Sequence, residues 1–556
     1  MTSMDSKDDP RIAELRRKEE EQLQEVLSGK YGLTYMNLTH ISINADALRI
    51  IPEEAARKAE AAGFDLIGKK LSLAVRSPSH PELPALLEDL EKRGYSVQEF
   101  MVSHASLEAA WMRYKELSFA TETKKGVLDV SPEELKKAIA EIHTVEDIQK
   151  AVSEVDSTKR AYRISRILEV ILAGAFAVNA SDIHLEPEEN TARMRYRMDG
   201  VLHDIANFDP ETHALLLSRL KLLSGLKLNV KNTAQDGRFE VVLDKTAIQV
   251  RSSVIPGGYG ETVVMRLLNP ESIAVPFESL GMEPRLQALV EREIKKPNGM
   301  LINTGPTGSG KTTTLYACLR KVLSSEIKII TIEDPIEYHV EGIVQTQVEH
   351  KKYTFLEGLR SALRQDPDII MIGEIRDEEV ARTAIDAALT GHFVFSTLHT
   401  NNAAGTFPRL ADLSVDPKVF GSAIGVAMAQ RLVRKLCGEC KKQVELPAET
   451  QKRVQKVLDG LRDKSAAPKD TTHAWEASGC AACNGTGYKG RIGVFEAIVV
   501  DSEMDTFLRD NPSERDIQRI QEKRDLLTMY EDGIMKVLAG ITSLDELDRV
   551  VIEEEA

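Results

Sequence analysis

The sequence predicts an α/β fold with a parallel β-sheet, because strand-like and helix-like segments alternate through its second half. A glycine-rich stretch at 305–313 follows one apolar run and precedes a helical pattern. Three later apolar runs each end in polar residues, at 328–337, 368–374 and 393–399. The carboxyl ends of parallel strands meet at one edge of a sheet, so we expect the chemistry of this chain to gather there.

The N-terminal part divides into three segments that carry no catalytic pattern. Residues 1–30 mix acidic and basic side chains with scattered leucine, which favours a solvated helix over a binding element. Residues 31–120 alternate strand-like and helix-like stretches, and we expect a small α/β domain with a docking role. Residues 121–156 are rich in Lys and Glu and contain turn signals, so we interpret them as a linker with short helices.

Residues 157–270 predict an α+β domain that begins with an apolar helix and continues into strands. One face of the first strand carries three polar residues, Asp182, His184 and Glu186. These are potential metal ligands, but a solvated or interface strand face is the simpler interpretation. The later strands are rich in arginine, and Arg251 and Arg266 lie on consecutive predicted strands. An arginine from a neighbouring domain can stabilise charge during phosphoryl transfer, whereas plain surface ion pairs are the alternative.

The glycine-rich stretch reads G-x-x-x-x-G-K-T between a predicted strand and a predicted helix. This is the order that a phosphate-binding loop requires, because backbone N–H groups and the helix N-terminus then point at the same anion. Lys311 is expected to reach the β- and γ-phosphates, and Thr312 to place its hydroxyl on Mg²⁺. The residues that we assign to nucleotide binding are Gly305, Pro306, Thr307, Gly308, Ser309, Gly310, Lys311, Thr312 and Thr313.

The polar residues at the strand ends supply the other parts that phosphoryl transfer needs. Glu374 ends a buried strand and is our candidate for organising metal-bound water, although Gly373 stands where many such motifs carry an aspartate. An acidic cluster follows an earlier strand, with Glu333, Asp334 and Glu337. We expect one of these carboxylates to polarise the attacking water, and capping of turns is the alternative. His392 and His399 can contact the γ-phosphate or can be structural histidines.

Four of the five cysteines form two C-x-x-C pairs, Cys437 with Cys440 and Cys480 with Cys483. Each pair offers two thiolates from one tight turn, which suits a tetrahedral Zn²⁺ site. The gap between the pairs is longer than the common zinc-ribbon spacing, and a redox pair is the competing interpretation. Cys318 lies inside the helix after the phosphate loop, so we expect a buried core thiol.

Composition and charge limit the class of protein. The 556 residues are 42% hydrophobic and 29% charged, with a formal net charge of −15. This acidic balance disfavours a nucleic-acid-binding protein or a protein on anionic lipid. The longest apolar stretches are too short to span a bilayer, and the N-terminus has no apolar signal core. These features predict a cytoplasmic protein.

The sequence resembles the secretion ATPases of type II secretion and type IV pilus assembly. The strings that carry the resemblance include Ala180-Ser181-Asp182-Ile183-His184, Gln235-Asp236-Gly237-Arg238, Glu333-Asp334-Pro335-Ile336-Glu337, Gly373-Glu374-Ile375-Arg376-Asp377, Thr397-Leu398-His399-Thr400-Asn401 and Gln430-Arg431-Leu432-Val433-Arg434. They extend from about residue 163 to the C-terminal region, and the match of the N-terminal domain is looser. The resemblance implies a RecA-like P-loop ATPase domain at 271–436 after a PAS-like domain at 157–270. It also implies a zinc-binding module at 437–495 and a helical region at 496–556.

The resemblance further implies a function and a set of partners. A member of this family is expected to form a homohexamer at the inner face of the cell membrane, beneath a platform protein of the inner membrane. ATP hydrolysis then powers assembly of a pilus or pseudopilus. By position, Glu333 and Glu337 match the family's acidic box, Glu374 its Walker B motif, His399 its histidine box, and Arg251 and Arg266 its nucleotide-contacting arginines.

Two features bear on the choice among related functions. The cysteine pairs resemble a zinc module that is absent from pilus-retraction relatives, so assembly or export is favoured over retraction. A nucleic-acid translocase or DNA-uptake motor with the same core is the alternative, but direct nucleic-acid binding is not expected from the acidic balance. A non-hydrolysing docking module is disfavoured by the intact Lys311, Thr312 and Glu374.

Overall fold

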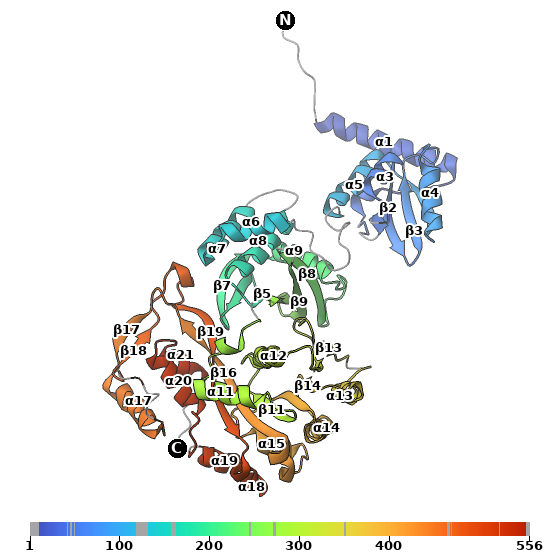
Figure 1. The fold of residues 1–556 in the computed structure, drawn as a ribbon. Helices are drawn as coiled ribbons and strands as arrows, with labels where there is room; N and C mark the ends of the chain where they lie inside the picture. The colour runs from blue at the N-terminus through green and yellow to red at the C-terminus, as the bar shows by residue number, and fades with distance from the viewer. Residues whose placement is uncertain are drawn as a thin grey trace. The chain divides into compact units, whose positions relative to one another are not determined.

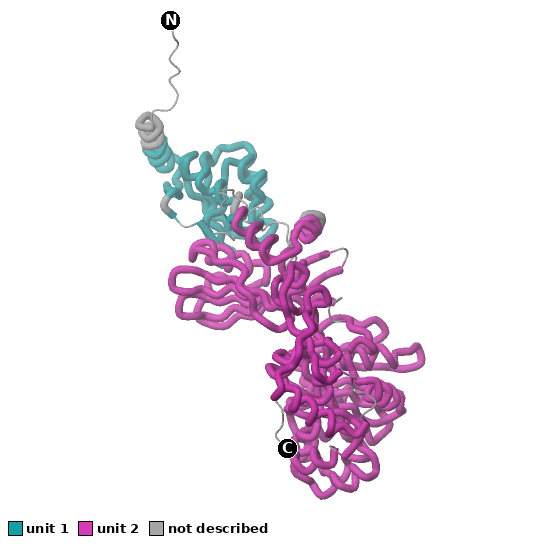
Figure 2. The backbone as a smooth tube through the Cα atoms, turned by 90° about the vertical axis from the view of Figure 1, so that its left-hand side faces the viewer, with its two compact units in different colours: residues 1–131, 156–166 teal, residues 132–155, 167–556 magenta. Residues whose placement is uncertain are grey.

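The structure, a computed structural model, divides the chain into two compact units (Figure 2). Unit 1 comprises residues 1–131 and 156–166, and unit 2 comprises residues 132–155 and 167–556. The residues that the structure describes are 10–41, 43–44, 47–48, 50–117, 132–156, 163–243, 246–270, 274–349, 352–463, 468, 470–521 and 523–551.

Unit 1 is a small α/β domain, as the strand-like and helix-like stretches of 31–120 predict. Its sheet has the order β1-β4-β3-β2, with β1 (Thr34–Tyr35), β2 (Ala61–Ile67), β3 (Lys70–Val75) and β4 (Ser96–Met101). Its helices are α1 (Pro10–Tyr31), η1 (Leu38–His40), α3 (Glu53–Lys58), α4 (Leu83–Lys92) and α5 (His104–Leu117). Apolar residues of this sheet and of α5 form one core, in which Leu71, Leu73 and Leu107 are fully buried.

The first part of unit 2 is an antiparallel sheet with helices, which we call the arginine-bearing domain. The sheet order is β7-β6-β5-β10-β9-β8, with β5 (Asp182–Pro187), β6 (Ala192–Met198), β7 (Val201–Phe208), β8 (Gln235–Leu243), β9 (Thr246–Gly257) and β10 (Gly260–Leu268). Its helices are α6 (Pro132–Glu141), α7 (Val145–Asp156), α8 (Arg163–Ala177) and α9 (Pro210–Leu223). Buried and half-buried residues alternate along β6, so one face of the sheet packs against the helices. On that face, the Tyr196 hydroxyl donates to the Ile171 carbonyl of α8 at 2.5 Å.

The rest of unit 2, which we call the ATPase domain after the expectation from the resemblance, completes the predicted α/β fold. It is built on a seven-stranded sheet of order β13-β12-β14-β15-β11-β16-β19. Its strands are β11 (Gly299–Thr304), β12 (Ile329–Glu333), β13 (Val344–Gln347), β14 (Ile369–Ile372), β15 (Phe393–Leu398), β16 (Ile424–Leu436) and β19 (Tyr488–Val499). All neighbouring strands run parallel except β19, which is antiparallel to β16. The expected parallel sheet with its polar strand ends at one edge is therefore confirmed.

Two helical layers cover this sheet because alternate strand residues face opposite sides. Ile329 packs into the core with α11 (Pro284–Glu293) and α12 (Lys311–Val322), whereas its neighbour Ile330 packs into the core with α13 (Phe355–Ala362) and α14 (Glu378–Leu389). The second layer also contains α15 (Thr406–Asp412) and α16 (Phe420–Ala423), and Figure 1 shows α13 and α14 on the same side of the sheet. Short 3₁₀ helices are η2 (Phe277–Ser279), η3 (Leu363–Gln365) and η4 (Pro417–Val419). Cys318 of α12 is fully buried in the first core, as predicted.

The C-terminal part packs its helices on the same sheet. It contains the two-stranded sheet β17 (Lys442–Glu445) with β18 (His473–Glu476), the 3₁₀ helix η6 (Ala481–Cys483), and the helices α17 (Ala448–Gly460), α18 (Ser502–Leu508), α19 (Glu514–Gln521), α20 (Met529–Leu538) and α21 (Leu544–Val550). Apolar residues of α17 to α21 join the core of the second layer. The end of the predicted C-terminal region, 552–556, lies outside the described residues.

The domain boundaries expected from the sequence differ from the packing at two places. In the segment 121–156, residues 121–131 lie outside the described part, but α7 buries Ile148 and Val152 and packs on α8. In the segment 437–495, the residues from Tyr488 onward pair with β16 as a strand of the central sheet. Spacing of cysteines alone does not reveal where the next strand joins a distant sheet.

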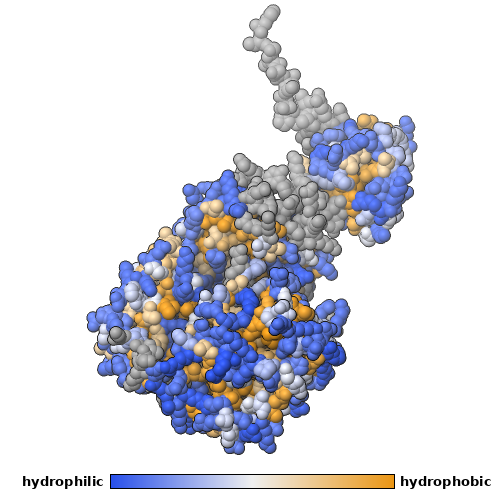
Figure 3. All heavy atoms as spheres, in the orientation of Figure 1, coloured by the Kyte–Doolittle hydropathy of each residue, from blue (hydrophilic) through white to orange (hydrophobic). Residues whose placement is uncertain are grey.

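No helix in the described ranges qualifies as a membrane-spanning helix. None of their helices has both the length and the apolar composition that crossing a bilayer requires. Hydrophilic side chains cover most of the face that Figure 3 shows, with hydrophobic ones in small groups.

Candidate nucleotide and metal sites

The phosphate loop connects the end of β11 to the start of α12, as predicted. Gly305, Gly308 and Gly310 have φ angles of 144°, 81° and 89°, which residues with a Cβ adopt only with strain. Gly310 is the N-cap of α12, so the N-terminus of that helix opens directly onto the loop. Thr312 and Thr313 follow in its first turn and are half-buried. This backbone can receive a phosphate group through N–H groups and the helix dipole.

Gln430 of β16 fixes the base of this loop, a role that the sequence analysis did not assign. Its side chain is 2% exposed, and its Oε1 accepts hydrogen bonds from Asn303 Nδ2 and Thr314 Oγ1, both at 2.8 Å. A Cβ on Gly305 would lie 2.6 Å from the Gln430 carbonyl oxygen, and one on Gly310 would lie 2.9 Å from Gln430 Nε2. The available sequence signal was a glutamine inside the otherwise apolar start of β16.

Lys311 is held inside the loop by backbone oxygens. Its Nζ donates to the carbonyls of Gly305 at 2.7 Å and Pro306 at 3.1 Å. Burial lowers the pKa of Lys311 to about 8, the nearby Glu374 raises this pKa, and the charge of Arg431 lowers it. Arg431 also lies beside the loop: its Nη1 would be 3.1 Å from a Cβ on Gly305, and its Nη2 donates to the Asn401 carbonyl at 2.8 Å. Two cationic side chains therefore lie at the phosphate loop.

The strand ends next to this loop bring Glu374 and His399 together. His399 Nε2 lies 3.1 Å from Glu374 Oε2, and Arg376 donates a hydrogen bond to the other oxygen of the same carboxylate. Burial raises the pKa of Glu374, but the hydrogen bonds and charges of Arg376 and His399 outweigh it, so the pKa lies below its usual range. Glu374 is therefore an ionised carboxylate beside Lys311. His392, in contrast, contacts the Ala387 carbonyl through Nδ1 at 3.2 Å, which fits a structural histidine.

Glu333 ends β12 in a closed polar pocket. Its side chain accepts hydrogen bonds from Tyr316 of α12, from Thr331 of its own strand and from Gln345 of β13. The residue is 3% exposed, and this burial raises the pKa of its carboxyl above the usual value although the three donors lower it. A carboxylate surrounded by three protein donors is poorly placed to orient a water molecule, and it joins α12 to the edge of the sheet.

Glu337 and Arg251 connect the two domains of unit 2. Arg251 Nη1 contacts Glu337 Oε2 at 3.2 Å, and its Nη2 donates to the Ile336 carbonyl at 2.7 Å. Arg266 lies directly opposite Arg251 in the register of β9 and β10, but its Nε donates to Asp182 of β5 at 2.9 Å. Of the two predicted arginines, Arg251 contacts the acidic box, and Arg266 pairs within its own domain.

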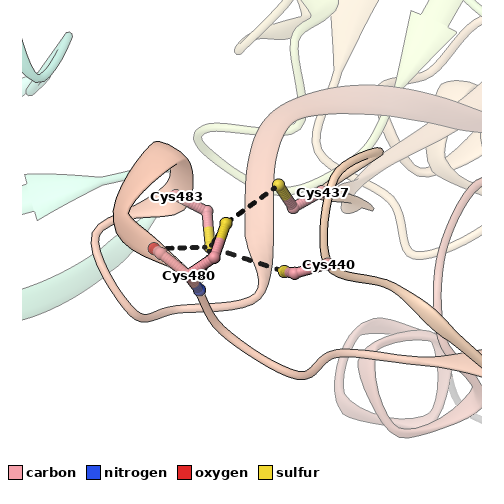
Figure 4. A group of neighbouring side chains, drawn as sticks. All are labelled: Cys437, Cys440, Cys480 and Cys483. Atoms are coloured by element: carbon pink, nitrogen blue, oxygen red, sulfur yellow. Dashed lines mark hydrogen bonds between the residues drawn. The ribbon is translucent and has the colours of Figure 1, made fainter.

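The four cysteines of the two C-x-x-C pairs converge at one point, to which each pair contributes from its own turn (Figure 4). The sulfur distances are 3.9 Å for Cys437–Cys480, 3.8 Å for Cys440–Cys483 and 3.7 Å for Cys480–Cys483. Ligands at about 2.3 Å from a tetrahedral Zn²⁺ are about 3.8 Å apart, so the donor set and its spacing fit this metal. We call the two turns, 437–441 and 480–487, the cysteine module.

One residue of the cysteine module has a lowered pKa. Although burial raises the pKa of the Cys483 thiol, the backbone N–H groups of Cys480 and Gly487 donate to its sulfur and bring the pKa down to about 7. Asp182 and Glu186, the other potential metal ligands, are paired with Arg266 and Arg195 instead. Within the described ranges, the cysteines are the one group whose ligand atoms converge on a metal-sized space.

The chain is similar to known secretion proteins along most of its length. The family model described as "Type II/IV secretion system protein" matches residues 157–549. The chain is 42% identical over 392 residues to the type II secretion system protein E of Pseudomonas aeruginosa, which covers 70% of this chain and 76% of that protein. It is 34% identical over 536 residues to the type IV pilus assembly ATPase PilB of Myxococcus xanthus, covering 95% and 91%.

A solved structure supports the fold. The ATPase DotB of Yersinia pseudotuberculosis has a TM-score of 0.51 and 20% sequence identity, and the match covers 71% of this chain and 94% of that chain. The family model spans well over half of the sequence and includes both the phosphate loop and the cysteine module. The chain therefore belongs to the Type II/IV secretion system protein family.

Proposed function

We propose that this chain is a motor ATPase that powers assembly of a type IV pilus or a type II secretion pseudopilus through an inner-membrane platform protein. The observation that carries the proposal is a glycine loop that opens onto the N-terminus of α12 and encloses Lys311, with the carboxylate of Glu374 near enough to raise the pKa of that lysine. That arrangement suits binding and hydrolysis of a nucleoside triphosphate. The relatives named as a type II secretion protein E and a pilus assembly ATPase support secretion or pilus assembly as the process that the hydrolysis powers.

The residues of the loop have separate roles in this proposal. Backbone N–H groups of 305–313 and the N-terminus of α12 hold the phosphates, and Lys311 contacts the β- and γ-phosphates. Bound Mg²⁺, with the Thr312 hydroxyl as a ligand, would supply positive charge on the phosphate oxygens. Glu374 orients water at this place, and His399 holds that carboxylate from the neighbouring strand. Catalysis then depends chiefly on positioning and charge.

The choice of the water-polarising residue follows from burial. Glu333 is enclosed by three hydrogen-bond donors, so we assign it a positioning role and leave Glu337 and Glu374 as the candidates for a general base. Arg251 already contacts the acidic box, and Arg266 must leave Asp182 before it can contact a nucleotide. Both arginines would stabilise transition-state charge when the arginine-bearing domain closes on the site.

The assembly is a further part of the proposal. We infer a cytoplasmic homohexamer that attaches to the inner face of the membrane through the platform protein, as the family resemblance implies. The match to the pilus assembly ATPase extends over 95% of the chain, whereas the match to the secretion protein extends over 70%. This wider coverage favours pilus assembly. A nucleic-acid translocase is the alternative, and the net charge of −15 weighs against it.

We propose Zn²⁺ as the ion of the cysteine module, with Cys437, Cys440, Cys480 and Cys483 as ligands. The spacing of the four sulfur atoms supports four-coordinate thiolate binding. Metal analysis of freshly purified, reduced chain is expected to find about one zinc per chain. A content far below this value would contradict the assignment.

The activity is tested by phosphate release with ATP and Mg²⁺. Lys311→Ala is expected to abolish hydrolysis and to weaken ATP binding, and Glu374→Gln to slow hydrolysis about 100- to 1,000-fold while ATP still binds. Lys321→Ala is the matched control, because this lysine lies on the same helix but pairs with Glu278 at its far end. Wild-type rates in both active-site variants would refute the proposal. DNA-stimulated hydrolysis would favour the translocase instead.

A further inference from the structure

Two hydrogen bonds join the arginine-bearing domain to the cysteine module and to the start of β19, the strand that follows the module. In the first, Asn484, which directly follows Cys483, accepts the N–H of Val145 through Oδ1 at 3.1 Å. Val145 is the first residue of α7, and the first N–H groups of a helix have no partner within it. The Asp147 carboxylate of α7 accepts hydrogen bonds from the N–H groups of His143 and Thr144 at 3.0 and 2.9 Å. The cysteine module thus provides part of the cap of a helix in another domain.

The second hydrogen bond lies at the turn between β6 and β7. Asp199 Oδ2 accepts the N–H of Gly490 at 2.9 Å, just after the second pair of cysteines. Asp199 and Gly200 have φ angles of 47° and 86°, so both central residues of this two-residue hairpin turn are left-handed. The turn fixes where the Asp199 side chain points. The arginine-bearing domain therefore contacts the region of the cysteine module with a helix and with a sheet turn.

Both contacts involve elements that pack into the core or the sheet of the arginine-bearing domain. Ile148 of α7 is fully buried and packs on Gly174 of α8, where an added Cβ would lie 2.9 Å from it. The β6–β7 turn belongs to the same sheet as β9, which carries Arg251. Arg251 contacts Ile336 and Glu337 on the ATPase domain. The domain is thus attached at two separated places, the acidic box and the cysteine module.

The shape of the second cysteine turn depends on its sulfur atoms. Cys483 Sγ accepts the N–H groups of Cys480 and Gly487, both at 3.2 Å, and Asn484 takes a left-handed φ of 50° between them. A metal ion held by the four sulfurs would fix this same turn. We propose that the metal-loaded cysteine module positions the arginine-bearing domain on the ATPase domain, directly through Asn484 and indirectly through the adjoining start of β19, where Gly490 donates to Asp199. The proposal rests on the metal binding proposed above and is independent of ATP hydrolysis.

Glycine is the clean truncation at both positions, because their φ angles are positive and alanine would add backbone strain. Asn484→Gly removes the acceptor for Val145, and Asn484→Asp keeps it with the same shape. Asp199→Gly and Asp199→Asn form the equivalent pair for Gly490. The N-terminal turn of α9 is an internal control, because it is capped by its own Asp209.

The test is amide hydrogen exchange of the full chain, first metal-free and then after addition of Zn²⁺, with zinc content measured in the same samples. Zinc is expected to slow exchange of residues 143–149 about fivefold in wild type and in Asn484→Asp, as one added hydrogen bond would do. The response is lost in Asn484→Gly, and α9 does not respond in any variant. The Gly490 amide, whose N–H donates to Asp199, is expected to respond likewise for the Asp199 pair.

Three outcomes would overturn the proposal, and they have different meanings. If one zinc binds per chain and 143–149 exchanges at the same rate with and without it, the cysteine module is only a local fold element. An equal response in Asn484→Gly and wild type would show that the metal acts on α7 by a route other than Asn484, which also contradicts the proposal. If no zinc binds, both the assignment of Zn²⁺ to the four cysteines and this proposal are wrong. Neither result bears on ATP hydrolysis, which phosphate release measures separately.

Discussion

At the scale of single residues, burial sets the charges around the phosphate loop. Lys311 is enclosed by the loop that it serves, so its ammonium loses hydration and its pKa falls to about 8. Glu374 remains ionised because Arg376 and His399 contact it. Opposite charges are therefore already in place before a nucleotide arrives, and the lysine is the member of the pair that is sensitive to pH.

The lowered pKa of Lys311 predicts a pH dependence of ATP binding. Below about pH 8 the free chain carries the ammonium, and above it the neutral amine. Phosphates favour the ammonium, so we expect ATP affinity to fall as the pH rises through 8, by up to about tenfold per pH unit. Titration with a fluorescent ATP analogue between pH 7 and 9.5 measures this slope. Lys311→Arg stays charged and is expected to bind with a nearly flat profile, and an equal slope in both proteins would contradict the prediction.

The enclosure of Glu333 predicts a loss of stability in Glu333→Gln. Tyr316 donates to one carboxylate oxygen, and Thr331 and Gln345 donate to the other. The amide replaces one of these oxygens by an NH₂ group, which then faces at least one donor. We expect the unfolding free energy of the ATPase domain to fall by about 1–3 kcal/mol. Glu337→Gln is the matched control, because the Glu337 side chain is one-third exposed and pairs with Arg251. Denaturant unfolding compares the two, and equal losses would argue against the assigned positioning role.

At the scale of elements, the phosphate loop depends on β16, a strand that comes much later in the sequence. The loop lies between β11 and α12, but β16 supplies Gln430, whose side chain joins Asn303 before the loop to Thr314 after it. The close approach of the Gln430 carbonyl to Gly305 leaves no room for a side chain. The phosphate loop and β16 therefore form one structural unit, because the backbone of the loop fits only against the packed strand.

This unit predicts that glycines of the loop differ in their tolerance of alanine. Gly305→Ala places a Cβ 2.6 Å from a backbone oxygen, whereas a Cβ at Gly308 meets no atom within 4 Å and adds only the strain of its φ of 81°. We expect Gly305→Ala to weaken nucleotide binding more than tenfold and Gly308→Ala to lower stability by about 1 kcal/mol. Calorimetric titration with ADP and thermal unfolding measure both effects. Similar binding in the two variants would show that the contact with β16 is not rigid.

At the scale of the whole molecule, the candidate site gathers residues from both domains of unit 2. Lys311, Glu374 and His399 come from the ATPase domain, and Arg251 comes from β9 of the arginine-bearing domain. Movement between these domains would change the charge around the nucleotide without altering the loop itself. Such an arrangement suits an enzyme that converts hydrolysis into motion.

The proposed hexamer predicts that activity depends on assembly. We expect the rate of phosphate release per chain to rise with protein concentration as rings form. Added Lys311→Ala chain is expected to lower the activity of a fixed amount of wild-type chain, because inactive copies enter the same rings. Sedimentation in parallel gives the assembly state. A constant rate per chain, with no effect of the added variant, would indicate that each chain works alone.

Much of the fold and part of the site can be predicted from sequence because their signals are local. The parallel sheet follows from apolar runs with polar ends, and the phosphate loop from glycine spacing between a strand and a helix. The C-x-x-C spacing likewise indicated which cysteines converge. In contrast, the sequence placed Glu333 and Glu337 in one acidic cluster and gave no reason to treat them differently.

The sequence by itself determined the family, the loop and the chemical types available at the strand ends, since each depends on residues close together in the chain. Only the tertiary structure decided which groups are buried and paired. Tyr316 and Gln345 enclose Glu333, Gln430 supports the loop from 116 residues beyond Thr314, and Asn484 meets Val145 across 339 residues. Burial and long-range pairing depend on how distant elements pack, which no local pattern encodes.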